Sequence, residues 1–128
     1  MPTPEQIDTI RRLNDAARTH PGLASLANVT MGFQALPELD RFAALVAITR
    51  FTKFDGNNDP HGEHDFGAIY KLATGAWTQD RPDDAKAVVQ TVFWKIDCYD
   101  TSLTYGSDAP WNPEQTKRVL TIMLASEY

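Results

Sequence analysis

The strongest strand signal in this chain is the run of residues 87–99, which reads AVVQTVFWKIDCY. Successive side chains of a strand point to opposite faces of a sheet, so alternate positions can be assigned to two faces. One face carries Val88, Val92, Trp94, Ile96 and Cys98, and the other carries Phe93, Lys95, Asp97 and Tyr99. This alternation predicts a long strand with an apolar face.

A second alternating run covers residues 66–73, with Phe66, Ala68, Tyr70 and Leu72 on one face, and predicts another strand. The segment 74–86 between the two runs contains Gly75, Pro82 and several charges, which is typical of a turn or an excursion. We expect the two strands to pair antiparallel around it. The start of the first would then lie beside the end of the second.

Upstream, a first helix is expected to begin at Pro4. Thr3 and Gln6 have the spacing of a capping box, and Pro21 with Gly22 ends the helical pattern. Residues 24–35 are poor in charge and alternate at Val29, Met31 and Phe33, which predicts a strand.

Two further helices are predicted. One opens at Pro37 and is apolar on two sides, so we expect it to be largely buried. The other opens at Pro113 after a cap at Asn112. Val119, Leu120, Met123 and Leu124 are expected to form its buried side. The expected fold class is α+β, a small antiparallel sheet packed by about three helices. The expected organisation is a single domain over residues 1–128, in which residues 1–22 form a peripheral N-terminal helix.

Composition and charge narrow the functional classes. The chain has 128 residues and a net charge of −5, which argues against non-specific nucleic-acid binding and favours a protein partner with a basic surface. A single cysteine, Cys98, cannot form an intrachain disulfide. The N-terminus lacks a signal-peptide pattern, and no apolar run is long enough to span a bilayer. We therefore expect a cytoplasmic protein that does not enter membranes.

The candidate site is the loop at residues 57–67, which reads NNDPHGEHDFG. Two of the three histidines lie in it, among several carboxylates. If the two strands pair as expected, this loop lies close to the end of the 87–99 strand. The candidate ligand-binding or partner-binding residues are Asp59, His61, Asp65, Lys95, Tyr99, Asp100 and Tyr105.

Four interpretations of this loop remain open. In the first, His61, His64 and a carboxylate such as Asp97 hold a divalent metal such as zinc, and Glu63 acts as general base on metal-bound water. In the second, metal-free acid–base chemistry uses His64 or His61 as the base and Glu63 or Asp97 as the orienting group, and the candidate catalytic residues are Glu63, His64 and Asp97.

The third interpretation is calcium binding. Asp55, Asn57 and Asp59 match the opening of an EF-hand loop, but Pro60 and Phe66 replace its glycine and its glutamate. In the fourth interpretation the loop is structural, and its polar side chains satisfy backbone donors.

Four segments together resemble a family of small bacterial proteins classed as a domain of unknown function. They are NDPHGEHDFG (58–67), FWKIDCYD (93–100), LTYGS (103–107) and RVLTIMLASEY (118–128). The resemblance covers roughly residues 25–128, although Cys98 stands where a second tyrosine is commoner. No catalytic residues are established for this family, so the resemblance implies none in this chain. It implies an association with plasmids and other mobile elements.

Two functions follow as expectations. The first is a non-enzymatic interaction protein of bacterial mobile elements, which inhibits a host nuclease or defence complex or regulates plasmid genes. The alternative is a metal-binding protein or metal-dependent hydrolase centred on the HGEHD segment, residues 61–65.

Overall fold

The computed structural model describes residues 1–128 and contains three α-helices and one five-stranded, mostly antiparallel sheet. The predicted α+β class is confirmed. The helices are α1 (Pro4–Thr19), α2 (Met31–Gln34) and α3 (Glu38–Thr49). The strands are β1 (Leu26–Val29), β2 (Phe66–Leu72), β3 (Trp77–Thr78), β4 (Val88–Tyr99) and β5 (Lys117–Leu124). Short 3₁₀ turns are η1 (Ala85–Ala87) and η2 (Ala125–Glu127).

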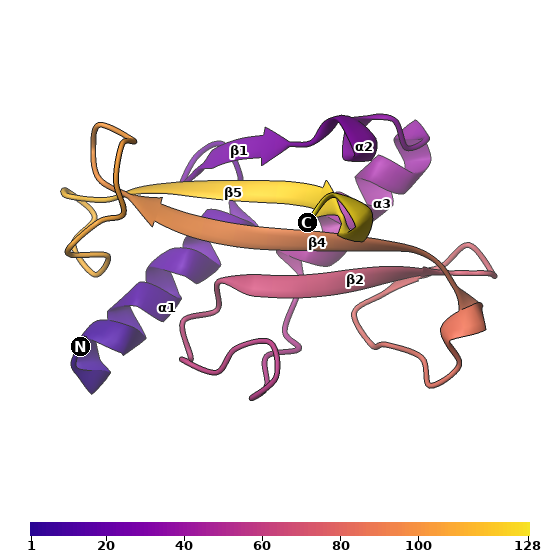
Figure 1. Ribbon diagram of the computed structural model, residues 1–128, viewed down its shortest axis with the longest axis horizontal. Helices are drawn as coiled ribbons and strands as arrows, with labels where there is room; N and C mark the ends of the chain where they lie inside the picture. The colour runs from indigo at the N-terminus through magenta and orange to yellow at the C-terminus, as the bar shows by residue number, and fades with distance from the viewer.

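The strands lie in the order β1-β5-β4-β2-β3, so the two longest strands form the middle of the sheet (Figure 1). Only the β1–β5 pair is parallel. The predicted antiparallel pairing of β2 with β4 is confirmed, with Phe66 opposite Lys95 and Tyr70 opposite Thr91. The candidate loop therefore reaches the sheet beside the last third of β4.

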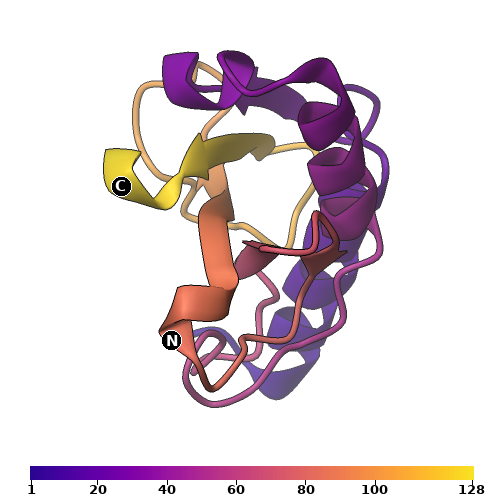
Figure 2. The ribbon, with the colours of Figure 1, turned by 90° about the vertical axis from the view of Figure 1, so that its right-hand side faces the viewer.

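Helices α1 and α3 cover one face of the sheet, as the end view shows (Figure 2). The C-terminal turn η2 lies on the other side. On β4 Val92, Trp94 and Ile96 face the helices and are buried, whereas the residues that alternate with them are partly exposed. We call this second side the open face. It carries Phe66, Ala68 and Tyr70 of β2 and Thr91, Phe93, Lys95, Asp97 and Tyr99 of β4.

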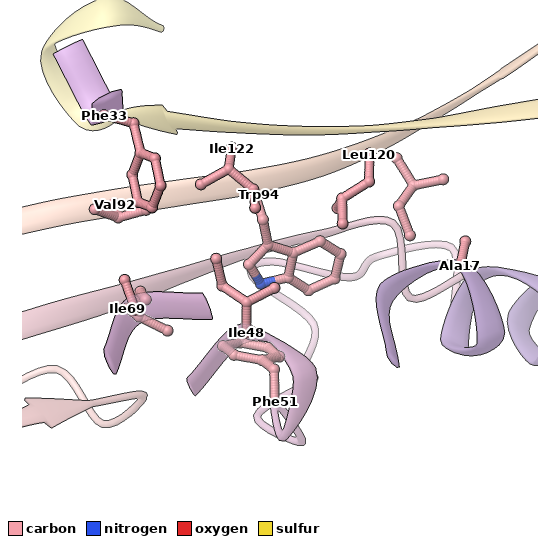
Figure 3. Packing of buried hydrophobic residues seen from close by; sticks show 11 residues of the cluster. Ala17, Phe33, Ile48, Phe51, Ile69, Val92, Trp94, Leu120 and Ile122 are labelled. Carbon is pink, nitrogen blue, oxygen red and sulfur yellow. The ribbon is translucent and has the colours of Figure 1, made fainter. Parts of the chain in front are cut away.

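The core lies between the helices and the sheet and is centred on Trp94, which is fully buried (Figure 3). Its indole ring meets Phe51 edge-on, with the centroids 5.4 Å apart. Such T-shaped pairs are favoured by the ring quadrupoles. Gly67 lies directly against this pair, because a Cβ at that position would be 2.5 Å from Trp94 Nε1. The sequence therefore needs glycine here for close packing.

Helix α1 begins as predicted. Thr3 caps it, and Gln6 completes the capping box. Ile10, Asn14, Ala17 and Arg18 of this helix are all buried, and the helix contacts β5, β4 and α3. In the structure α1 is thus an integral part of the helical layer rather than a peripheral segment.

The predicted helix at residues 113–124 is wrong, because residues 117–124 form the strand β5. This strand is paired on both sides, with β1 and β4, and is buried on both faces at Ile122 and Met123. A strand covered on both faces reads as a continuous apolar run, which can satisfy helical spacing by chance. Asn112 caps a turn instead, since its side chain accepts a hydrogen bond from the Glu114 amide at 3.0 Å.

Two other predictions are corrected. The strand predicted at 24–35 stops at Val29, and Thr30 then caps the single helical turn α2. Helix α3 forms where expected but is not largely buried. Leu39 is 84% exposed and Phe42 is 68% exposed, because the helix turns only its Ala44–Ile48 side to the core.

None of the three helices has the length and apolar character needed to cross a membrane.

Candidate functional site

The first half of the candidate loop is held by its own side chains. The Asp55 carboxylate accepts hydrogen bonds from the amides of Asn57 and Asn58, at 2.8 and 3.2 Å. The Asn58 side chain in turn accepts a hydrogen bond from the Asp55 amide at 2.9 Å and donates one to the Lys53 carbonyl at 2.7 Å. Asp and Asn commonly order turns in this way. Asp55, the first residue of the calcium-loop resemblance, therefore uses its carboxylate as a local cap.

The second half of the loop is held by α1. Arg11 Nε donates to the Gly62 carbonyl at 2.7 Å, and Asn14 Nδ2 donates to the Glu63 carbonyl at 2.9 Å. Gly62 has a φ of 70°, a left-handed conformation that glycine adopts without strain. Through these two side chains the helix binds the backbone of the loop.

His64 lies at the centre of this arrangement. Its ring stacks on Phe54, with centroids 3.7 Å apart and an interplanar angle of 3°. Nδ1 lies 2.9 Å from Asp15 Oδ1, and Nε2 lies 3.7 Å from Asp59 Oδ2. Because an ionised carboxylate can only accept, Nδ1 carries the proton in the contact with Asp15. The His64 backbone has a φ of 56°, so these contacts hold a non-glycine residue in a left-handed conformation.

The three proposed metal ligands do not meet. His61 is exposed, His64 faces Asp15 and Asp59, and Asp97 Oδ2 lies 3.0 Å from Lys95 Nζ. No group of three or more histidine, cysteine, aspartate or glutamate side chains has an arrangement that could hold a metal ion. The acid–base pairing also differs from the expected one, because the carboxylate closest to His64 is Asp15 rather than Glu63 or Asp97.

The expected convergence of carboxylates at the start of β2 occurs for Asp65 and Asp97. The Ile96 amide donates to the Asp65 carbonyl at 2.8 Å, which brings Asp65 beside the last residues of β4. Burial raises the pKa of Asp65, and the nearby charges of Asp59 and Asp97 raise it further. Burial also raises the pKa of Glu63, and the charge of Asp65 adds to this effect. Asp59, Glu63, Asp65 and Asp97 thus form an acidic cluster, in which the ionisation of Glu63 and Asp65 is opposed.

The remaining candidates lie on the open face or in the loop that follows it. Lys95 and Tyr99 project from β4 on the same face as Asp97, as the alternation predicted. Asp100 orders the next loop, where its Oδ1 accepts from Ser102 and Thr104; the hydrogen bond from Ser102 is the main cause that lowers its pKa. Tyr105, in this same loop, is 73% exposed.

The open face has a hollow of about 650 Å³ next to the candidate loop. Its apolar lining comes from five residues, namely Phe51, Phe66, Ala68, Tyr70 and Phe93. Its polar lining includes Lys53, Asp55, Asp80 and Arg81. Beside it, the rings of Phe66, Phe93 and Tyr128 pack together, with centroids 5.3 to 5.9 Å apart. We call this hollow, with its aromatic rim, the groove.

Sequence reasoning did not single out the polar residues of α1 that contact the loop. Arg11, Asn14, Asp15 and Arg18 follow the spacing i, i+3, i+4, i+7, so they share one side of the helix. Asn14 and Arg18 are nevertheless buried. The sequence did contain one indication of these contacts, namely polar residues at helical spacing next to the apolar stripe. It does not show which segment of the chain they contact.

Comparison with curated proteins found no match, and comparison with solved structures found none either. A family match covers residues 29–127, which include β2 to β5, the candidate loop and the open face, but not α1 and only the last residue of β1. The chain therefore belongs to the family described as "Protein of unknown function (DUF3768)".

Proposed function

We propose that this protein is a non-enzymatic interaction protein of bacterial mobile elements, which binds a partner protein through the open face of its sheet. The observation that carries the proposal is the groove of about 650 Å³ on a sheet face that α1 and α3 leave uncovered. Its rim is the aromatic cluster of Phe66, Phe93 and Tyr128. Aromatic side chains are enriched at the centres of protein interfaces.

The acidic cluster supports a partner with a basic surface. Glu63 and Asp65 have raised pKa values because burial, and then the charge of neighbouring carboxylates, opposes their ionisation. A cationic group placed beside them would relieve this repulsion. The net charge of −5 would also speed the encounter with a basic protein. The cluster directly precedes Phe66 in the chain, so one partner could contact both the cluster and the groove.

Proteins that handle DNA carry such basic surfaces, because they must neutralise phosphates. The resemblance to a mobile-element family supports a partner of this kind. We therefore propose a host nuclease or defence complex as the partner, which the protein inhibits by covering its nucleic-acid-binding surface. A basic regulator of plasmid genes would be bound by the same chemistry. A metal-dependent hydrolase is not proposed, because His61, His64 and Asp97 face different surroundings.

The test begins with affinity capture from a host extract at low salt, followed by purification of the identified partner. Its affinity is then measured by calorimetry at about 50 and 300 mM salt, and its activity on DNA is measured with and without this protein. A double variant, Phe66→Ser with Phe93→Ser, tests the groove, and Asp97→Lys tests the acidic cluster. Glu38→Lys makes the same charge change in α3, on the other side of the sheet.

We expect both open-face variants to bind at least ten-fold more weakly and the Glu38 variant to bind like the parent protein. Binding should weaken at high salt, because screening reduces the attraction between exposed charges. A partner that binds the groove variant as tightly as the parent, or binds independently of salt, would show the proposal to be wrong.

A further inference from the structure

Arg118, at the start of β5, is a buried cation that forms no ion pair, although the charges of Cys98 and Glu63 act on it. It is only 6% exposed. None of the ion pairs in the structure includes it. Burying a charge is costly unless it is paired, so a lone guanidinium at such a depth calls for an explanation. By contrast, the similarly buried Arg18 has Asp15 at 2.9 Å.

The hydrogen bonds of Arg118 leave part of its guanidinium free. Nε donates to Asn14 Oδ1 at 2.7 Å, and Nη2 donates to the Pro110 carbonyl. A guanidinium carries five N–H groups, so three of them have no acceptor in the protein. The buried nitrogens without any partner are Nε of Arg18, Nε of Arg41 and Nε1 of Trp94. Arg118 Nη1 has no acceptor and is not among them, so this nitrogen still reaches solvent.

Arg118 is one of the residues that line a small pocket. The pocket has a volume of about 260 Å³ and lies between α1, the segment that follows it and the start of β5. Leu13, Ala16, Ala24 and Pro113 form its apolar walls. Thr116 also lines it, but its hydroxyl already donates to the Ala109 carbonyl at 2.9 Å. Arg118 is thus the one charged side chain in an apolar pocket.

We propose that this pocket binds an aliphatic carboxylate, with the carboxylate on Arg118 and the alkyl chain against Leu13, Ala16, Ala24 and Pro113. Arg is suited to this because its planar fork can donate two parallel, charge-assisted hydrogen bonds to a carboxylate. The volume corresponds to roughly nine water molecules at about 30 Å³ each, which fits an acid of four to six carbons. Burial lowers the pKa of Arg118, and a bound anion would compensate for this loss of solvation.

Two sources share this chemistry, a free short-chain acid and the C-terminal residue of a peptide. The pocket shares no lining residue with the groove on the open face. The proposal is therefore independent of the proposed function.

The test is titration of the full-length protein at pH 7 with sodium butyrate and sodium hexanoate, followed by backbone amide NMR. 1-Butanol and sodium chloride serve as controls for the alkyl chain and for salt. We expect saturable shifts at Ala16, Ala24 and Thr116 with the carboxylates and none with butanol or chloride. A peptide that ends in Gly-Val, compared with its C-terminal amide, distinguishes the two sources. Binding of the free-acid peptide would identify a chain terminus as a source, and binding of small acids alone would identify free acids.

Two variants test the pocket without changing Arg118. Ala24→Leu should fill the pocket while keeping Arg118, and should weaken butyrate binding at least ten-fold. Ala73→Leu makes the same change at an exposed alanine outside the pocket and should bind like the parent. The proposal is overturned if butanol shifts the same residues as strongly as butyrate, if neither acid gives saturable shifts, or if the Ala24 variant binds as tightly as the parent.

Discussion

At the residue scale, His64 stabilises the loop instead of being free to act as a ligand. Its ring is stacked on Phe54 and lies beside Asp15, so both the face and one edge of the imidazole are in use. His61, three residues earlier, is exposed. The two histidines that form the same motif in the sequence therefore have different structural roles.

We predict that His64→Ala lowers stability by about 1–3 kcal/mol, because it removes a partly buried hydrogen-bonding partner and the stacked ring. Thermal unfolding followed by circular dichroism should show a decrease in Tm of several degrees. His61→Ala is the matched control and should unfold within about 0.5 kcal/mol of the parent, as exposed substitutions usually do. Equal effects of the two substitutions would contradict this assignment.

Gly67 gives a second prediction at this scale. A Cβ there would lie 2.5 Å from Trp94 Nε1 and 2.7 Å from the Phe51 ring, both in the core. Gly67→Ala should therefore destabilise the protein by about 1–3 kcal/mol, since overpacking forces neighbours to shift. Gly56→Ala, where a Cβ would meet nothing within 4 Å, is the control. Chemical denaturation checks both variants, and a Gly67 variant as stable as the Gly56 variant would refute the packing argument.

Glu63 provides a pH-dependent prediction. Its pKa in the folded protein is raised, first by burial and then by the charge of Asp65, so folding favours its protonated form. This contribution to stability is fully present below the unfolded pKa of about 4.3 and is lost as pH rises through the raised folded pKa. Glu63→Gln removes the titration. The variant should be more stable than the parent at pH 7, and this advantage should disappear below about pH 4. Urea unfolding across this range measures the difference, and an advantage that persists unchanged at low pH would exclude the mechanism.

At the scale of elements, α3 shows how one helix can combine a buried side with an apolar exposed side. Ile48 is fully buried, whereas Phe42 is 68% exposed. Sequence periodicity placed apolar residues on two sides of this helix and led to the prediction of a buried element. The sheet covers only one of those sides.

The consequence for stability can be measured with two substitutions in this helix. Ile48→Ala should cost about 2–5 kcal/mol, because it leaves a cavity beside Trp94 and Phe51 in the core. Phe42→Ser should change stability by no more than about 0.5 kcal/mol, because an exposed ring loses little on removal. Guanidinium unfolding curves of the two variants and the parent provide the comparison. A large loss for Phe42→Ser would mean that this ring is covered in solution.

At the scale of the whole molecule, α1 holds the loop, the sheet and α3 together. It buries Ile10 and Ala17 and donates hydrogen bonds to the carbonyls of Gly62 and Glu63. The family match begins only at residue 29, after this helix. The segment outside the match therefore completes the helical layer over the matched part.

Deletion of residues 1–19 should accordingly remove cooperative unfolding. The free energy lost with this buried surface should be comparable to the whole free energy of unfolding, which is usually about 5–15 kcal/mol for a domain. Differential scanning calorimetry would test this, with deletion of residues 1–3 as the control. Hydrogen exchange at residues 62–64 in the full chain should show protection that depends on α1. A truncated protein that still melts cooperatively near the parent Tm would show that α1 is dispensable.

Several features of this protein followed from the sequence by itself, because they depend on neighbours in the chain. The alternation in residues 87–99 correctly predicted β4, and Thr3 with Gln6 predicted the start of α1. The pairing of β2 with β4 also followed, since both strands alternate and a turn-like segment joins them. This pairing brings Asp65 beside the end of β4, whereas Glu63 is also held by α1.

Only the tertiary structure decided the rest, because those features depend on residues far apart in the chain. The run at 117–124 became a strand because β1 and β4 pair with both of its edges, a constraint that its own periodicity does not contain. The role of His64 depended on Asp15, 49 residues away, and the exposure of Arg118 to a pocket depended on the position of α1. Local patterns specify which structures a segment can form. Burial and pairing partners select among them, and these exist only once the chain has folded.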